Sequence, residues 1–171
     1  SLQNAEKKDS QEICFIDPMD NYAEYIKRAG YTSRPGNFVD KNGNVLGKHQ
    51  GILNYTIGQR KGLGIALGKP AFVTKIDYEK NTVTLGDNED LFNTSVISCN
   101  NIFTAYSAKI YDGKEVLAKV RYSAKPAKAT IKEDGNRIIA TFEEPQRAAT
   151  PGQSIVFYEG DHVIGGGFIS E

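Results

Sequence analysis

The chain has 171 residues, of which 39% are hydrophobic, and its 21 basic and 21 acidic side chains cancel to a formal net charge of zero. This length accommodates one domain or two small ones around a real hydrophobic core. No apolar run approaches the roughly 18 residues of a membrane helix, and the first residues do not resemble a signal peptide. We therefore expect a cytoplasmic protein with no membrane partner.

The first 30 residues predict a short lead and one helix. Residues 1–16 are polar up to the apolar run Ile13-Cys14-Phe15-Ile16. Residues 17–30 have apolar side chains at helical spacing and end in Gly30, so we expect a helix that this glycine terminates.

Two hairpins are expected next. Asn42-Gly43 separates the apolar pairs at 38–39 and 45–46, and this dipeptide favours a type I′ hairpin turn. Residues 71–77 and 82–86 predict the second hairpin.

A basic, glycine-rich segment at residues 51–64 lies between these hairpins and contains Arg60 and Lys61. Its glycines allow the backbone to approach a partner closely, but it lacks the Gly-Lys-Ser/Thr spacing of a Walker phosphate loop. Contact with RNA and packing against a neighbouring domain fit this segment equally well.

Short strands separated by turns make up the rest of the chain, after a boundary expected near residues 87–93. The expected strands are 95–98, 102–106, 115–122, 127–132, 137–142, 154–158 and 162–169. Their even spacing favours a small closed barrel, which leaves no exposed strand edge. The expected fold class is mainly β, with a small central β-rich domain that carries one short helix (residues 17–90) and a C-terminal six-stranded barrel (residues 91–171).

Basic residues cluster along the sequence. Positions 41–75 and 116–132 contain basic but no acidic residues, whereas acidic residues gather at 87–90, 133–134 and 143–144. Such stretches can follow a phosphate backbone. Solvated outer faces of strands give the same pattern, and the spacing alone favours that alternative.

Several motifs, in order, resemble the tRNA-specific 2-thiouridylase family. They are Lys7-Lys8-Asp9-Ser10 with Ile13-Cys14-Phe15-Ile16, the segment 55–64, Arg121-Tyr122, Pro145-Gln146-Arg147-Ala148 with Thr150-Pro151-Gly152-Gln153, and Gly165-Gly166-Gly167. The family has an N-terminal ATP-pyrophosphatase domain, a small central domain and a C-terminal barrel similar to a barrel domain of elongation factor Tu. The resemblance implies that residues 1–16 end the first of these domains, and that this chain is an expressed fragment, inactive alone.

The resemblance also implies the chemistry, which is sulfur transfer to the wobble uridine at position 34 of tRNA. ATP with magnesium, bound outside this chain, adenylates the C2 oxygen, and a cysteine persulfide then attacks C2. Cys14 matches the persulfide carrier, and a cysteine in the missing domain resolves the enzyme as a disulfide. The implied partners are tRNA and a persulfide donor such as a cysteine desulfurase or relay protein. A sulfur nucleophile reacts as the anion, whereas the residue pattern alone favours a buried core role for Cys14.

The resemblance places tRNA contacts on Arg121, Tyr122 and Gln153. An arginine pairs with phosphate, a tyrosine ring stacks on an unpaired base, and a glutamine amide both donates and accepts hydrogen bonds. A barrel-core position is the alternative for Tyr122. The pair Gln146-Arg147 is a further candidate of less certain role.

No cofactor or metal site is expected in this chain itself. His49 and His162 have no cysteine or carboxylate at metal spacing, and we expect loop structure around His49. Cys99 is interpreted as a packing residue, and both cysteines are expected to be reduced. Two alternatives to the sulfurtransferase stay open. One is a non-catalytic RNA-binding β-barrel module, and the other is an interaction module whose glycine-rich loop docks a protein.

Overall fold

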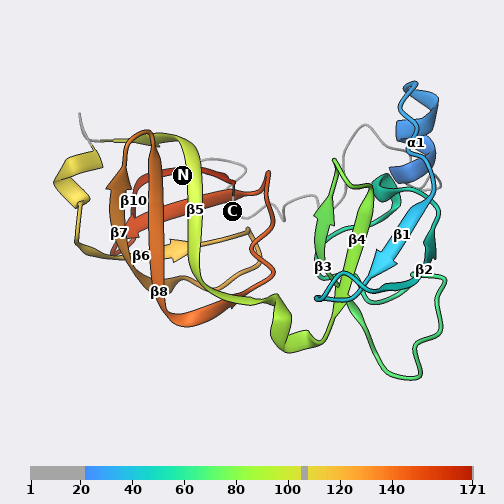
Figure 1. The fold of residues 1–171 in the computed structure, drawn as a ribbon. Coiled ribbons are helices and arrows are strands. Elements are labelled where there is room, and N and C mark those ends of the chain that lie inside the picture. The colour runs from blue at the N-terminus through green and yellow to red at the C-terminus, as the bar shows by residue number, and fades with distance from the viewer. Residues whose placement is uncertain (1–21, 105–107, 171) are drawn as a thin grey trace, which may run out of the picture.

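A four-stranded sheet and a closed six-stranded barrel lie side by side in this protein (Figure 1). The computed structural model describes residues 22–104 and 108–170. The central part contains helix α1 (Tyr22–Arg28) and strands β1 (Gly36–Val39), β2 (Val45–His49), β3 (Phe72–Asp77) and β4 (Thr82–Gly86), in the sheet order β2-β1-β4-β3.

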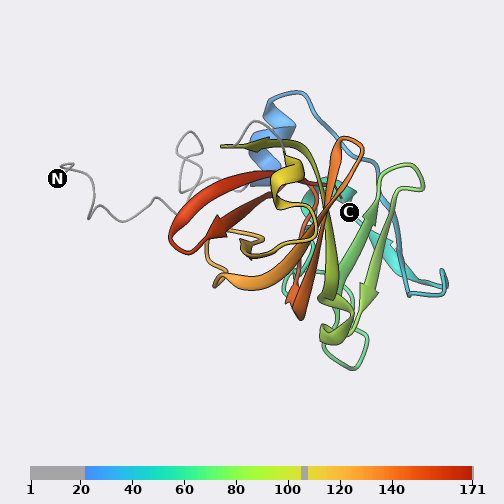
Figure 2. The same ribbon diagram turned by 90° about the vertical axis from the view of Figure 1, so that its left-hand side faces the viewer.

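The barrel follows in the second half of the chain. Its strands are β5 (Phe92–Phe103), β6 (Glu115–Lys119), β7 (Ala127–Asp134), β8 (Arg137–Arg147), β9 (Ser154–Glu159) and β10 (His162–Ile169), closed in the order β10-β5-β8-β7-β6-β9. Figure 2 shows these strands curving around the barrel interior. The mainly β class and the closed six-stranded barrel are confirmed, while the likeness to a barrel of elongation factor Tu stays a prediction. No helix in the described ranges is long and apolar enough to cross a membrane.

Each part has its own hydrophobic core. Phe38, Val73 and Val83 are fully buried between the sheet and its covering loops. Ile155 and Phe157 are fully buried inside the barrel. Two separate cores mean that the contacts between the parts, rather than a shared interior, set their relative orientation.

Gly30 terminates α1, as the sequence predicts. It has a φ of 89°, and its N–H donates to the Lys27 carbonyl at 3.1 Å while the Tyr31 N–H donates to the Ile26 carbonyl at 3.1 Å. This pair of bonds is a Schellman motif, which a glycine adopts without steric cost. Residues 17–21 of the expected helix lie outside the described part of the chain.

The β1–β2 hairpin is confirmed, but its predicted type I′ turn is wrong. That turn requires a positive φ at both Asn42 and Gly43, and only Gly43 has one, at 87°. Asp40 explains the difference. One of its carboxylate oxygens accepts the backbone N–H groups of Asn42 and Asn44, each at 2.8 Å, and its carbonyl accepts the Gly43 N–H at 3.0 Å. The aspartate therefore stabilises a longer loop.

Two predicted strands, 95–98 and 102–106, are one continuous strand up to Phe103. Asn100 takes a φ of 50°, and the Asn101 side chain accepts from the Ser98 hydroxyl at 2.8 Å and donates to the Ser98 carbonyl at 3.0 Å. These local bonds carry β5 through a bend at residues 99–101, where the sequence predicts a gap between two strands. The β3–β4 hairpin formed as expected.

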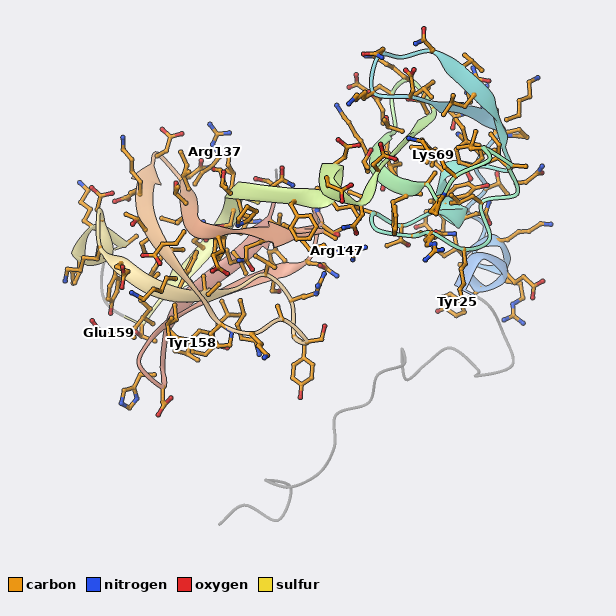
Figure 3. The ribbon with its side chains drawn as sticks, turned by 90° about the horizontal axis from the view of Figure 1, so that it is seen from below. Tyr25, Lys69, Arg137, Arg147, Tyr158 and Glu159 are labelled. Atoms are coloured by element: carbon orange, nitrogen blue, oxygen red, sulfur yellow. The ribbon has the colours of Figure 1, made fainter. Side chains whose placement is uncertain are left out.

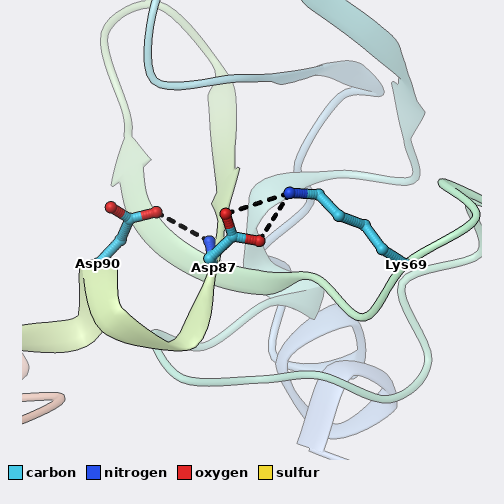
Figure 4. A network of polar contacts seen from close by, with 3 residues as sticks. All are labelled: Lys69, Asp87 and Asp90. Carbon is cyan, nitrogen blue, oxygen red and sulfur yellow. Dashed lines mark hydrogen bonds and ion pairs between the residues drawn. The ribbon is translucent and has the colours of Figure 1, made fainter.

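A 3₁₀ turn, Asn88–Leu91, links the sheet to the barrel. Lys69 contacts both carboxylate oxygens of Asp87 at 2.8 and 3.1 Å, and Asp90 Oδ2 accepts the Asp87 N–H at 2.8 Å (Figure 4). The linking turn is thereby attached to the loop before β3.

Candidate nucleic-acid interface

The three predicted tRNA-contacting residues lie at one end of the barrel, which we call the junction end. It is formed by residues 120–126 after β6, residues 148–153 after β8, and the start of β5. Strand register places these three segments at the same end of the barrel. Lys119, which ends β6, lies opposite Val156 near the start of β9, and Phe92, which begins β5, lies opposite Arg147, which ends β8. The junction end is also where the chain arrives from the central sheet.

Arg121 follows β6 in a turn rather than lying on a strand. The predicted strand 115–122 ends at Lys119, and the Ala124 N–H donates to the Arg121 carbonyl at 3.1 Å. The half-buried Arg121 side chain donates from Nη1 to the Arg147 carbonyl at 3.1 Å. A guanidinium has five N–H donors, so this bond orients Arg121 and leaves capacity for a phosphate.

Tyr122 is a surface residue, so its alternative reading as a barrel-core aromatic is wrong. Its relative exposure is 69%, because the turn carries it away from the barrel interior. The Lys119 ammonium lies 5.5 Å from the centre of its ring. A cation beside an exposed aromatic ring is an arrangement suited to a stacked base with an adjacent phosphate.

Gln153 ends a turn that the sequence predicts correctly. Its N–H donates to the Thr150 carbonyl at 3.1 Å, and Gly152 has a φ of 87°, which with Pro151 before it is the geometry of a type II turn. The Gln153 carbonyl accepts the Ile169 N–H at 2.7 Å, which fixes the turn to β10. The side chain of Gln153 is exposed.

The basic glycine-rich loop approaches the junction end from the central part. Gly58 and Gln59 bond with the backbone of Val73 at 2.8 and 2.9 Å, so the loop runs along β3. A Cβ placed on Gly58 would lie 3.4 Å from the Ala148 Cβ. At Gly58, therefore, this segment packs against the barrel, which is one of the two uses that the sequence leaves open. Arg60 and Lys61 follow it and are exposed, so both uses fit within the one loop.

Ion pairs reduce the apparent basic character of the two acid-free stretches. Lys69 pairs with Asp87 at 2.8 Å, and Lys128 pairs with Glu115 at 3.1 Å. Each lysine donates a hydrogen bond to its partner carboxylate, which raises the pKa of Lys69 and of Lys128, and the bond from Lys69 lowers the pKa of Asp87. These two cations are committed to neighbouring acids, which leaves the junction end as the better candidate for phosphate contact.

Arg147 belongs to the pair Gln146-Arg147, which the sequence offers as a further candidate for tRNA contact. Its Nε donates to Asn88 Oδ1 at 3.2 Å, and its guanidinium carbon lies 5.8 Å from the centre of the Phe72 ring. Figure 3 shows it between the barrel and the central sheet. Its position at the end of β8 becomes visible only when the strand is seen to extend five residues beyond the predicted Phe142.

His49 is a structural residue that sequence reasoning described only as part of a loop. It is 1% exposed, its Nδ1 accepts the Gly51 N–H at 3.0 Å, and its Nε2 lies 3.2 Å from the Asn81 carbonyl. Nε2 therefore carries the proton and donates. Burial lowers the pKa of His49, so the neutral ring is favoured.

Cys14, the predicted sulfur carrier, lies outside the described residues. Cys99 is a half-buried free thiol on β5. Among residues 22–104 and 108–170, no group of three or more histidine, cysteine or acidic side chains could hold a metal ion.

Comparison with known proteins gives two family matches and a set of relatives. Residues 23–87 match the tRNA methyl transferase PRC-barrel domain, and residues 101–169 match the aminomethyltransferase beta-barrel domain. The chain is 56% identical over 165 residues to the tRNA-specific 2-thiouridylase MnmA of Clostridium perfringens, covering 95% of the chain and 45% of the relative. The proteins of the same name from Lachnoclostridium phytofermentans and Clostridium acetobutylicum are 53% and 54% identical, over 96% of the chain and 46% of each relative. The chain spans about half the length of these curated relatives.

Proposed function

From the premise that the chain belongs to the tRNA-specific 2-thiouridylase family, we propose that it supplies the tRNA-binding surface and the sulfur-carrying cysteine of a tRNA 2-thiolation enzyme. The membership agrees with the resemblance read from the sequence motifs. The proposed substrate is a tRNA with uridine at wobble position 34.

The arrangement at the junction end is the observation that carries the binding part of this proposal. Arg121 and Tyr122 lie on one turn and Gln153 on another, both at the same end of the barrel, with the Lys119 ammonium beside the Tyr122 ring. Cations fix the phosphates of an RNA loop, and an exposed aromatic ring stacks on a base that is not paired. An anticodon loop offers both groups.

The chemical part of the proposal assigns sulfur transfer to Cys14. The C2 oxygen of the uridine attacks the α-phosphorus of ATP and releases pyrophosphate, so that the oxygen becomes part of an AMP leaving group. The terminal sulfur of a persulfide on Cys14 then attacks C2, the C2–O bond breaks, and AMP leaves. A second cysteine attacks the persulfide bond, which releases the sulfur to the nucleoside as a thiocarbonyl and leaves a disulfide in the enzyme. A thiol reductant first reduces this disulfide to two thiols. A persulfide donor then transfers its outer sulfur to the Cys14 thiolate and leaves as a thiol, which restores the starting state.

Equilibrium binding of an unmodified tRNA transcript to the 171-residue chain tests the surface. We expect the logarithm of the affinity to fall linearly with the logarithm of salt concentration, by about 0.7 to 0.9 per phosphate contact. Arg121→Ala should weaken binding, whereas Lys80→Ala should not, because Lys80 lies on the β3–β4 turn at the end of the sheet far from Phe72. Equal effects of the two variants, or no binding by the unaltered chain, would refute the proposal.

A thiolation assay tests the chemistry separately. When the ATP-pyrophosphatase domain of a relative precedes the chain, 2-thiouridine should form in tRNA, and Cys14→Ser should abolish it while tRNA affinity is unchanged. Cys99→Ser is the matched control and should retain activity. Binding without Cys14-dependent thiolation would favour the non-catalytic RNA-binding barrel.

A further inference from the structure

Arg147 is in contact with both parts of the molecule and with the linking turn. Its side chain bonds to Asn88 at 3.2 Å and lies over the Phe72 ring at 5.8 Å, while its backbone pairs with Phe92 in the barrel. One side chain therefore connects β8 of the barrel to β3 of the sheet.

The same residue also supports a candidate tRNA-binding side chain. The Arg147 carbonyl accepts the hydrogen bond from Arg121 Nη1 at 3.1 Å. The next residue, Ala148, has a φ of 52°, donates its N–H to the Leu91 carbonyl at 2.8 Å, and faces Gly58 in the basic loop. The Arg147 carbonyl thus bonds to the turn that carries Arg121, and the Ala148 methyl group faces the loop that carries Arg60 and Lys61.

We propose that Arg147 is a positioning residue that fixes the orientation of the sheet relative to the barrel. In this orientation, the loop with Arg60 and Lys61 and the turn with Arg121 and Tyr122 bind the same tRNA. This inference rests on the proposed function. It assigns Arg147 no contact with the RNA itself. The role follows from geometry, because the Arg147 Nε donates to Asn88 and the guanidinium lies over the Phe72 ring.

The physical basis is that the two parts have separate cores. Relative motion is the default for domains joined by a short linker and a small interface. A planar guanidinium can bond through Nε and lie against an aromatic ring simultaneously, whereas a lysine ammonium cannot do both. Arg147→Lys keeps the charge but should lose the orientation.

Residual dipolar couplings of the full chain in solution test the orientation without any RNA. In the unaltered protein, the amides of the sheet and of the barrel should fit a single alignment tensor. Arg147→Ala and Arg147→Lys should each require two unequal tensors. Arg137→Gln, which removes an arginine at the opposite end of β8, should still fit one (Figure 3). One tensor in both Arg147 variants would overturn the inference.

Binding of a tRNA transcript tests whether the orientation matters for function. Arg147→Ala and Arg147→Lys should both weaken binding by at least about fivefold, the lower end of typical coupling effects. The double change Arg60→Ala with Lys61→Ala should weaken binding in the unaltered protein but add little in the Arg147→Ala background.

Two results would contradict the positioning role, and a third concerns only the proposed function. The first is that Arg147→Lys keeps the affinity for tRNA, while Arg147→Ala lowers the slope of log affinity against log salt concentration by the amount of about one phosphate contact. This result would show that Arg147 contacts the RNA directly. Full additivity with the Arg60 and Lys61 changes would show independent action. Absence of tRNA binding by the unaltered chain would refute the proposed function, and the dipolar couplings would still decide the role of Arg147.

Discussion

Replacement of Tyr122 by alanine should weaken tRNA binding while leaving the fold intact. The ring is 69% exposed, so little packing is lost, and surface changes of this kind usually alter the free energy of unfolding by no more than about 0.5 kcal/mol. Stacking of one base on an aromatic ring contributes about 1–3 kcal/mol, which corresponds to a loss of affinity of about 5-fold to 150-fold.

Tyr78 provides a matched control for this change. It is 70% exposed and lies on the turn between β3 and β4, at the end of the sheet far from the barrel. Fluorescence anisotropy with a labelled tRNA transcript should show a large loss for Tyr122→Ala, near-normal affinity for Tyr122→Phe, and no change for Tyr78→Ala. Equal losses for both alanine variants, or none for Tyr122→Ala, would refute the stacking role.

Three further predictions concern stability. Because burial lowers the pKa of His49 below its ordinary 6.5, the unfolded state binds the proton more readily, so the free energy of unfolding should fall as the pH decreases from about 7 to 5. Thermal melts across this pH range should show a smaller loss of stability for His49→Gln than for the unaltered protein, and the same loss for His162→Gln as for the unaltered protein. Identical pH profiles for the unaltered protein and both variants would contradict this. Phe157→Ala should cost about 3–5 kcal/mol in denaturant unfolding because the ring is fully buried, and a cost below about 1 kcal/mol would show that the barrel repacks. Gly152→Ala should cost about 1–2 kcal/mol because its φ is 87°, and an unchanged unfolding midpoint would contradict the type II turn.

The hairpins and the barrel could be predicted because their signals are local. Gly30 ends a helix, Pro151-Gly152 makes a turn, and alternating strands require a buried face, so each feature depends on neighbours in sequence. The turn at residues 40–44 was predicted with the wrong geometry, because the Asp40 carboxylate bonds to the backbone ahead of it and stabilises a competing loop.

The candidate site was predicted only in part, because its assembly depends on contacts distant in sequence. Motif resemblance located Arg121, Tyr122 and Gln153, and a strand was wrongly expected to include Arg121 and Tyr122. The contact between Arg121 and Arg147 spans 26 residues, and that between Arg147 and Asn88 spans 59. No local pattern indicates such pairs.

Chemical-shift mapping of the full chain during titration with an unmodified tRNA transcript tests the central claim most directly. The account predicts the largest amide shifts at residues 119–124, 148–153 and 58–61. Shifts confined to the outer barrel surface around Ile102 and Phe168, which are 79% and 51% exposed, would contradict it and place the RNA elsewhere.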